Sequence, residues 1–199
     1  MTRDRRTVDP EVLEKVRQVM TEHFAAQTFH NVGIRDICKA ARVSPKTLYK
    51  YFGSKEDLLL ACVERDLAEL TEITRQAVGE YPEDPMAQLL AVGRTFFNFY
   101  ITRQDVARIV FLNVPAIYWV NQASQAQTDF MGLIHSALVQ GQRDGTMTSE
   151  LDPVVLTNVL AGAANRLLAA WLISGTGSEE MLAHFEATYR SFFEGSLRN

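Results

Sequence analysis

The sequence is poor in the residues that build disulfide frameworks, zinc sites and membrane spans. Its 199 residues include only two cysteines, Cys38 and Cys62, which form no CxxC pair and so indicate neither a disulfide framework nor a metal site. The longest apolar run, residues 109–120, is interrupted by asparagine and proline and is shorter than the roughly 20 residues that a membrane helix needs. Residues 1–10 are charged and contain no apolar stretch of the kind found in secretory signals. We therefore expect a soluble cytoplasmic protein with no cofactor and no membrane partner.

Signatures of enzymes are also missing. The chain contains no GxSxG, HExxH, Walker loop or GxGxxG motif, and its four histidines show no metal-ligand spacing. The glycine-containing segment 175–178 follows no strand pattern, which indicates a turn rather than a phosphate-binding loop. A helical enzyme is therefore disfavoured. A redox-responsive regulator that uses Cys38 and Cys62 is another alternative, although we expect Cys38 on a buried helix face, where free thiols are usually unreactive.

Lysine is absent from most of the chain, and its distribution reveals a division of charge. All five lysines lie between Lys15 and Lys55. Residues 3–55 contain eleven Lys or Arg and six Asp or Glu, a net charge of +5, whereas the rest of the chain has nine arginines and eighteen acids, a net charge of −9. This is the distribution expected if only the first part approaches a polyanion such as nucleic acid. A solvated basic surface would give the same count, so charge alone leaves both interpretations open.

Hydrophobic spacing predicts an all-α protein that begins with a helix-turn-helix. A first helix is predicted over residues 10–27, and two short amphipathic helices follow over residues 34–41 and 45–52. The break between the short helices is Val43-Ser44-Pro45, in which serine is a favoured N-cap and proline a favoured first helical residue. The apolar residues of the second short helix recur at i and i+4, so its polar residues fall on the exposed side. This layout places one helix in a DNA major groove.

The motifs of this region resemble the DNA-binding domain of the TetR family of bacterial transcriptional regulators. The family hallmark is a Val-Ser turn followed by Thr-Leu-Tyr-x-Tyr-Phe and Ser-Lys-Glu-Asp-Leu, which match residues 43–44, 47–52 and 54–58. Two positions depart from the family pattern, since Gly33 stands where Thr or Ser is common and Arg42 where Gly is common. Loss of the hydroxyl cap at Gly33 costs a few tenths of a kcal/mol. A left-handed backbone at Arg42 would cost about 1 kcal/mol.

The resemblance implies about nine helices in two domains. Residues 9–54 would form the DNA-binding domain, with the helix-turn-helix at roughly 33–52, and residues 55–199 the ligand-binding and dimerisation domain. Donors on or beside the third helix are the candidate contacts to double-stranded operator DNA, because lysines and hydroxyls suit phosphate oxygens and those near the helix start reach base edges. The candidates are Arg35, Ser44, Lys46, Thr47, Tyr49, Lys50, Tyr51 and Lys55.

Apolar helices beyond residue 60 predict a homodimer. We expect helices over residues 55–78, 86–100, 105–112 and 116–141, and a further helix over 153–173 that is apolar almost all round and must be covered on two sides. With the last helix it would build a four-helix interface between two copies, as the resemblance implies. The expected interface residues are Leu160, Leu167, Trp171, Phe185, Tyr189 and Phe192. Such a dimer presents two recognition helices to a near-palindromic operator.

The larger domain is rich in Phe, Leu, Tyr and Trp, which suits a mostly apolar ligand pocket. We expect a repressor that a small, largely apolar effector releases, because the bound effector favours a spacing of the two DNA-binding heads that cannot fit the operator. The candidate pocket residues are Phe96, Tyr100, Arg108, Asn113, Tyr118, Trp119, His135, Asn165, Arg166 and Trp171. For each of them, burial in an ordinary core is the alternative interpretation.

Overall fold

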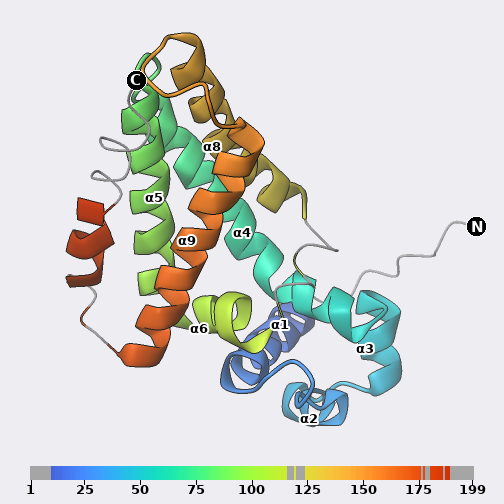
Figure 1. Ribbon diagram of the computed structural model, residues 1–199. Coiled ribbons are helices and arrows are strands. Elements are labelled where there is room, and N and C mark those ends of the chain that lie inside the picture. Colours follow the sequence, from blue (N-terminus) through green and yellow to red (C-terminus); the bar gives the residue numbers. More distant parts are fainter. Residues whose placement is uncertain are drawn as a thin grey trace, which may run out of the picture.

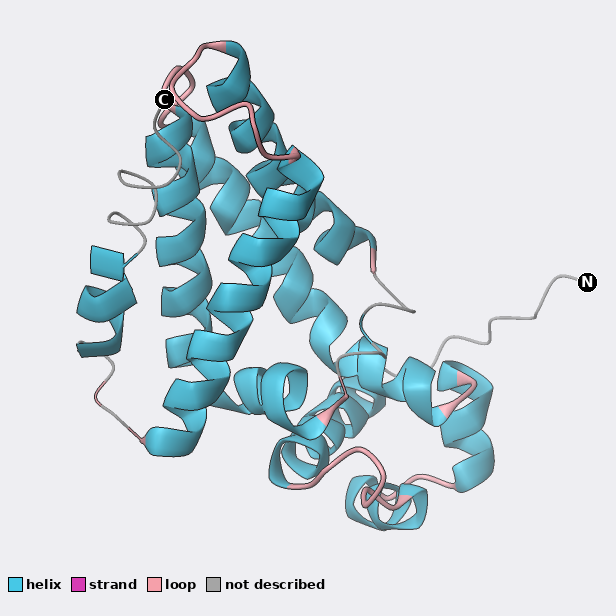
Figure 2. Cartoon of the chain, in the orientation of Figure 1, coloured by secondary structure: helices cyan, strands magenta, loops and turns pink. Residues whose placement is uncertain are grey.

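The computed structural model describes residues 10–115, 119, 124–175, 177, 180–185 and 187–188, and it confirms the all-α prediction. Helices account for all regular secondary structure in these residues (Figure 2). They are α1 (Pro10–Ala26), α2 (Ile34–Ala41), α3 (Pro45–Phe52), α4 (Lys55–Gly79), α5 (Pro85–Thr102), α6 (Gln104–Arg108), the π-helix η1 (Ile109–Asn113), α8 (Gln125–Arg143) and α9 (Pro153–Ser174). Residues 180–185 are also helical.

The long helix α4 joins a small head to a larger body. The head consists of α1, α2 and α3, and the body contains α5, α8 and α9 (Figure 1). α4 packs against α1 in the head and against α5 and α8 in the body. α6 and η1 lie at the base of the body, where both contact α1. The head and the body therefore share α4 and also meet through α6 and η1.

Side-chain caps define the starts of α3 and α4, and the cap of α3 is the serine that the sequence predicts. The Ser44 hydroxyl accepts a hydrogen bond from the Thr47 amide at 3.0 Å, so this serine is the N-cap of α3. Ser54 and Asp57 form a capping box in which each side chain accepts from the backbone amide of the other. Each cap satisfies amides that the first helical turn leaves without partners.

The two departures from the family pattern lie at the two ends of α2. Gly33 precedes the helix without a side-chain cap. Arg42 follows it in the left-handed conformation, with φ +58° and ψ +41°, and its amide donates to the carbonyls of Cys38 and Lys39. The cost of about 1 kcal/mol for this conformation is tolerated because α2 buries Ile37 completely in the head.

Two predicted helix boundaries differ from the observed ones. The predicted helix over 105–112 is divided into α6 and the π-helical η1. The described part of the predicted helix over 116–141 is α8, which begins after Ser124 because that hydroxyl caps the helix. Residues 116–118 and 120–123 lie outside the described residues. Hydrophobic spacing alone misses both features, because it locates neither a local change of hydrogen-bond pattern nor a side-chain cap.

The structure revises three of the expected interface residues. Leu160 and Trp171 of α9 are only 4% and 6% exposed, and Phe185 is 1% exposed, with its ring centroid 4.1 Å from that of Phe97. Side chains this deeply buried offer almost no surface to a second copy. Large aromatic and aliphatic residues pack inside their own chain first, which is why choosing interface residues by size misplaced them.

The outer side of α9 carries different apolar residues. Leu167 is 37% exposed, and Val155, Val159 and Ile173 are exposed by 50% or more. The helix is long and apolar enough to cross a membrane by length and composition, but its inner side packs against α6, η1 and α8. α9 is thus a core helix with a second, exposed apolar face. The other expected interface residues, Tyr189 and Phe192, lie outside the described residues.

Two glycines within helices provide a matched test of this packing. A Cβ atom at Gly93 in α5 would collide with the ring of Phe185, whereas one at Gly132 in α8 would meet nothing within 4 Å. We expect Gly93→Ala to destabilise the fold by about 1–3 kcal/mol through overpacking. Gly132→Ala should stabilise it by about 0.5–1 kcal/mol, because alanine is the better helix former. Urea unfolding measures both changes, and shifts of the same sign would contradict the packing of residues 180–185 on α5.

Candidate nucleic-acid interface and apolar cavity

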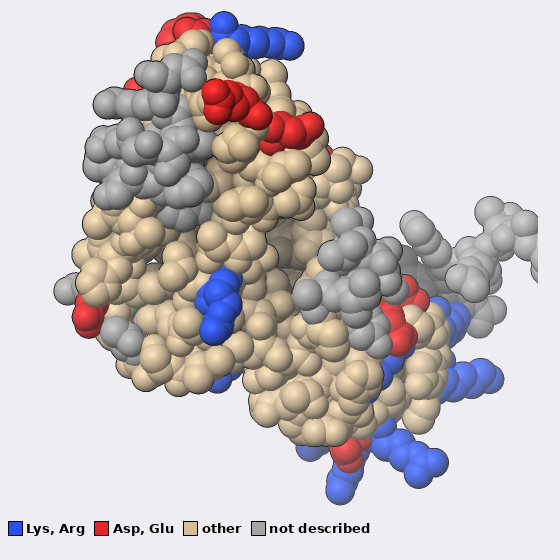
Figure 3. Space-filling view, in the orientation of Figure 1, with Lys and Arg blue, Asp and Glu red and all other residues tan. Residues whose placement is uncertain are grey.

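α3 presents an exposed basic and aromatic surface. Leu48 is buried beneath the helix and Phe52 is half-buried, so both face inward as their spacing predicts. Lys46, Tyr49 and Lys50 are exposed. In Figure 3 basic side chains project from the end of the molecule that holds the head, while the surface over α9 carries few charges. The α3 surface offers the donors and positive charge that suit a phosphate backbone.

The hydroxyls at the start of α3 are already hydrogen-bonded to each other. Ser44 Oγ and Thr47 Oγ1 lie 2.8 Å apart, and Ser44 Oγ also accepts from the Thr47 amide. The structure thus gives Ser44 a capping role that needs no DNA. Arg35 in α2 and Tyr51 in α3 are both exposed, and the Lys50 ammonium lies 5.6 Å from the centroid of the Tyr51 ring.

Lys55 has an aromatic partner at the start of α4. Its Nζ lies 4.6 Å from the centroid of the Phe29 ring, a cation–π geometry. Burial lowers the pKa of this lysine, and the neighbouring Glu56 carboxylate opposes that shift. The amides of a first helical turn suit an anion, but in α4 Ser54 caps the Asp57 amide and the turn carries the Glu56 and Asp57 carboxylates. A phosphate at this position would meet an ammonium that is already held in place.

A cavity of about 440 Å³ lies in the body between α4, α5, α8 and α9, and η1 forms part of its wall. Leu67 and Leu70 of α4, Ile134 of α8, and Leu160 and Ala164 of α9 are among its aliphatic lining residues. The surface beside α9 is visibly hollowed in Figure 3. A cavity of this size and lining lies within the range used for small, largely apolar ligands.

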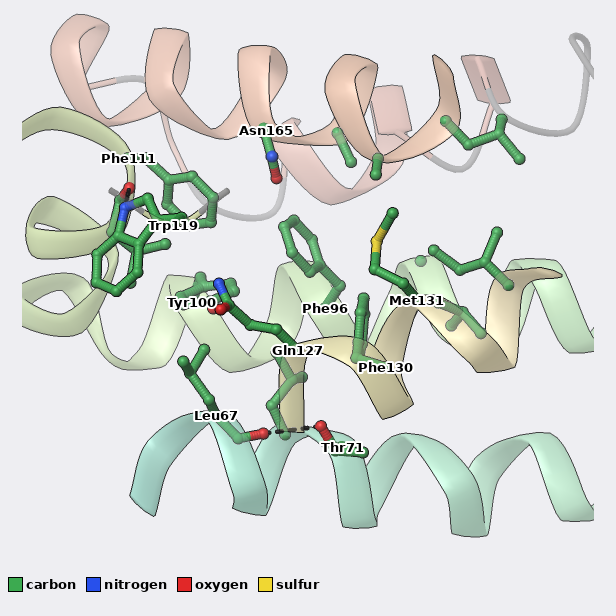
Figure 4. A pocket seen from close by; sticks show the side chains of 18 of the residues that line it. Leu67, Thr71, Phe96, Tyr100, Phe111, Trp119, Gln127, Phe130, Met131 and Asn165 are labelled. Atoms are coloured by element: carbon green, nitrogen blue, oxygen red, sulfur yellow. Dashed lines mark hydrogen bonds between the residues drawn. The ribbon is translucent and has the colours of Figure 1, made fainter. Parts of the chain in front are cut away.

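Aromatic rings form the centre of the cavity wall (Figure 4). The Phe96 ring centroid lies 5.0 Å from that of Tyr100, 5.9 Å from that of Phe111 and 6.0 Å from that of Phe130. Tyr100 and Phe111 are 4.8 Å apart and almost perpendicular. Burial raises the pKa of Tyr100, so its hydroxyl stays neutral. Such a wall favours an apolar chain or ring over a charged group.

Two polar groups in the wall are hydrogen-bonded within the protein. Thr71 Oγ1 lies 2.9 Å from the carbonyl oxygens of both Leu67 and Ala126, and so ties α4 to the start of α8. The Trp119 indole N–H donates to the Val110 carbonyl at 3.0 Å. Val110 belongs to η1, where a π-helical backbone leaves carbonyls free for such bonds. These groups hold the wall together and offer little to a ligand.

Two amide side chains in the wall have hydrogen-bonding groups that a ligand can use. Gln127 of α8 and Asn165 of α9 both extend toward the interior in Figure 4. The Gln127 Oε1 accepts from the Ser124 amide at 3.1 Å, which leaves its NH2 group without a partner among the described residues. Asn165 makes no hydrogen bond within the described part of the chain. A ligand with a polar group could therefore bond to these amides.

The structure brings half of the predicted pocket residues to this cavity. These are Phe96, Tyr100, Trp119, Asn165 and Arg166. Arg108 is instead exposed on α6, His135 is half-buried away from the lining, and Trp171 is buried on another side of α9. Asn113 is engaged elsewhere, and Tyr118 lies outside the described residues.

The sequence analysis missed the contributions of α4 and of the start of α8. Thr71, Gln127, Phe130 and Met131 all line the cavity. Their spacing is that of ordinary core residues, and nothing local distinguishes a side chain that faces a cavity from one that faces a packed neighbour. A buried threonine is no clear signal either, because Thr74 is buried in the same helix and does not line the cavity.

Asn113 at the end of η1 connects the cavity wall to the head. Its Nδ2 donates to the carbonyls of Phe24 at 3.0 Å and Ala25 at 2.7 Å, at the end of α1. The Phe29 amide donates in return to the Asn113 carbonyl at 2.8 Å. Phe111, two residues earlier, lines the cavity. One short segment therefore contacts both the cavity and the carboxyl end of α1.

Both cysteines are inaccessible. Cys38 is 5% exposed and Cys62 is 2% exposed. Burial raises the pKa of Cys38, and it raises the pKa of Cys62 to about 12. Because the thiolate is the reactive form, thiols in these environments react slowly at neutral pH. The geometry thus disfavours the redox-responsive alternative.

Comparisons with known proteins agree with this geometry. The family described as "Bacterial regulatory proteins, tetR family" matches residues 21–62. The chain is 26% identical to the HTH-type transcriptional regulator YdgC of Bacillus subtilis, an alignment that covers 85% of this chain and 86% of YdgC. It is 20% identical to the fatty acid metabolism regulator protein of the same species, covering 77% of this chain and 79% of that protein.

Solved structures share the fold over almost the whole chain. The fatty acid degradation regulator FadR of Bacillus halodurans superimposes with a TM-score of 0.76 at 19% identity, covering 94% of this chain and all of FadR. FadR of Bacillus subtilis in complex with stearoyl-CoA superimposes with a TM-score of 0.75 at 17% identity, covering 92% of this chain and 98% of that one. The matching head, the helical body and the family model agree, and the chain belongs to the TetR family of bacterial transcriptional regulators as a DNA-binding regulator rather than an enzyme.

Proposed function

We propose that this regulator is a cytoplasmic repressor that a small effector with an apolar chain releases from a near-palindromic operator. The cavity is the observation that carries this proposal, because it is large, almost uncharged and bordered by the segment that is hydrogen-bonded to α1. A ligand there would occupy space between the helices of the body. Its binding would favour one arrangement of η1 over another.

In this proposal α3 is the recognition helix. The exposed side of α3 contacts the operator through Lys46, Tyr49 and Lys50. Tyr51 and Arg35 lie beside them. Thr47 and Lys55 contribute donors from the two ends of the same surface. Ser44 acts chiefly by capping α3, since its oxygen is already occupied.

A homodimer supplies the second recognition helix. Val155, Val159 and Ile173 lie on one exposed stripe of α9, at spacings that bring each back to the same side of the helix. An apolar stripe of this kind favours burial against another surface. Packing α9 against α9 of a second copy creates an isologous interface, and two heads then reach half-sites about one turn or more apart.

An acyl chain is the effector class that the comparisons favour. FadR of Bacillus subtilis, which has the same fold, was solved in complex with stearoyl-CoA. The cavity here is lined mainly by leucines, phenylalanines and small residues, with the Asn165 amide and the Gln127 NH2 unpaired among the described residues. A flexible hydrocarbon chain suits such a lining, because it needs no hydrogen-bond partners along its length.

η1 transmits occupancy of the cavity to the head. A chain that contacts Phe111 displaces or fixes η1, and Asn113 passes that change to the carboxyl end of α1. α1 packs on α2 and α4, so its position affects the orientation of the recognition helix. The free energy available for release equals the difference in effector affinity between the DNA-bound and free arrangements.

The decisive experiment is a titration of operator binding. A duplex selected by the protein from a random library is labelled, and its affinity is measured by fluorescence anisotropy at fixed salt, with and without stearoyl-CoA. We expect the Kd for DNA to rise on the order of 5–150-fold when the effector is bound. Tight effector binding with an unchanged Kd for DNA would refute the repressor mechanism.

The role of α3 is tested by Lys50→Ala, with Lys15→Ala as the matched control. Both lysines are exposed, but Lys15 lies on α1 outside the recognition surface. We expect Lys50→Ala to weaken operator binding and to lower the slope of log affinity against log salt by about 1, because one phosphate contact is lost. Lys15→Ala should leave the slope unchanged, and identical slopes in the two variants would remove Lys50 from the interface.

The role of η1 is tested by Asn113→Ala, with the exposed amide variant Asn98→Ala as the control. The Asn113 variant loses two hydrogen bonds to α1, each worth about 1 kcal/mol, so its melting temperature falls. We also expect the ratio of the Kd for DNA with effector to that without effector to fall toward one, while the affinity for the effector changes little. A variant that is less stable but releases DNA as fully as the wild type would show that Asn113 only supports the fold.

A further inference from the structure

Arg166 is an unusual residue for its position. It is the only charged residue in the 22 residues of α9, and the only charged residue among the described residues that line the cavity. It is exposed, and it forms no ion pair with any described residue. Its side chain therefore stands at the edge of an apolar cavity without a counter-charge in the described part of the chain.

The neighbours of Arg166 on α9 make that lack of a counter-charge important. At helical spacing Arg166 shares the outer stripe with Val159 and Ile173, which are 50% and 72% exposed. If a second copy covers this stripe, the guanidinium loses water and needs an anion nearby. α9 has no carboxylate of its own, so α9 of a second copy supplies no partner for this arginine.

The cavity offers a place for such an anion. Asn165, the residue before Arg166, extends into the cavity, and successive helical residues are about 100° apart around the axis. Both residues are exposed and line the cavity, so Arg166 lies at its rim, turned further outward than Asn165. The Asn165 amide and the Gln127 NH2, which has no partner among the described residues, also line this cavity. The lining thus combines hydrocarbon, neutral amides and one guanidinium.

We propose that the effector is an amphipathic anion, with its apolar chain among the aromatic rings and its anionic group paired with Arg166 at the rim. This inference rests on the proposed function, because it assigns the head group of the same effector. A free carboxylate and the phosphates of a coenzyme A thioester share the required chemistry. Neutral and cationic chains of the same length lack it.

Four ligands with one chain length test the proposal: dodecanoate, lauroyl-CoA, dodecanol and dodecyltrimethylammonium. Each displaces the neutral fluorescent probe N-phenyl-1-naphthylamine from the full-length protein near neutral pH, where the carboxylate is ionised. We expect the better of the two anions to bind about tenfold or more tightly than dodecanol, as a charge-assisted contact implies. The cationic chain should bind most weakly. Tighter binding of dodecanoate would indicate a carboxylate site, and tighter binding of lauroyl-CoA would indicate a phosphate site.

The variant Arg166→Gln should remove the preference for anions while leaving dodecanol affinity within about twofold, because the apolar contacts remain. Arg166→Lys should restore part of the preference, since an ammonium keeps the charge but loses the planar fork of donors. Arg108→Gln is the matched control, because it removes an exposed arginine from outside the cavity. Added salt should weaken anion binding in the wild type but not in Arg166→Gln.

The possible results separate this inference from the function on which it rests. If all four chains bind equally, or if Arg166→Gln keeps the wild-type preference, the anionic head group is excluded while the apolar effector survives. If no chain displaces the probe, the proposed effector class fails, and the head group fails with it. If Arg166→Gln instead weakens dimerisation in sedimentation equilibrium without changing the preference, the arginine pairs with a carboxylate of the second copy.

Discussion

The constraint on which the rest of the structure depends is that α4 must belong to two cores at once. Near its start, Leu58, Leu59 and Val63 are buried in the head, while Leu67 and Thr71 face the cavity in the body. Because α4 is one continuous helix packed in both parts, a change in how it packs in the body also affects how it packs in the head. This rigid connection makes a change in the cavity relevant to the position of α3.

The cavity and its frame are stabilised by different interactions. An apolar void forfeits dispersion contacts, so a structure that keeps one must hold its walls by other means. Here the means are hydrogen bonds that run between elements: Thr71 ties α4 to α8, Trp119 bonds to η1, and Asn113 joins η1 to α1. All three bonds end on backbone carbonyls, so they fix backbone positions while side chains remain free to adapt. A ligand that fills the void restores dispersion contacts and so favours one arrangement of the helices that form the walls.

The sequence predicts the head far better than the body. The Ser44 cap, the Ser54–Asp57 capping box and the left-handed Arg42 are local features, determined by residues within one turn. Ser44 has the geometry that the sequence predicts. The cavity depends on which of many apolar faces fail to touch, and that follows from the packing of four helices that are distant in sequence. Phe96 could be proposed because it is aromatic, but Thr71 and Gln127 look like ordinary helix residues until the fold brings them together.

α9 shows why apolar periodicity is ambiguous in this protein. Its residues are hydrophobic almost all round, and the pattern does not say which side faces the chain's own core. In the structure Leu160, Leu168 and Trp171 are buried, while Leu167 and the β-branched Val155, Val159 and Ile173 remain outside. Bulky side chains gain most from the close-packed interior. Short branched ones lose little entropy when a second surface covers them, which makes the outer stripe suited to an interface. Burying an arginine of that stripe against an apolar surface would cost desolvation free energy. Its position at the cavity rim allows the proposed anionic group of the effector to offset that cost.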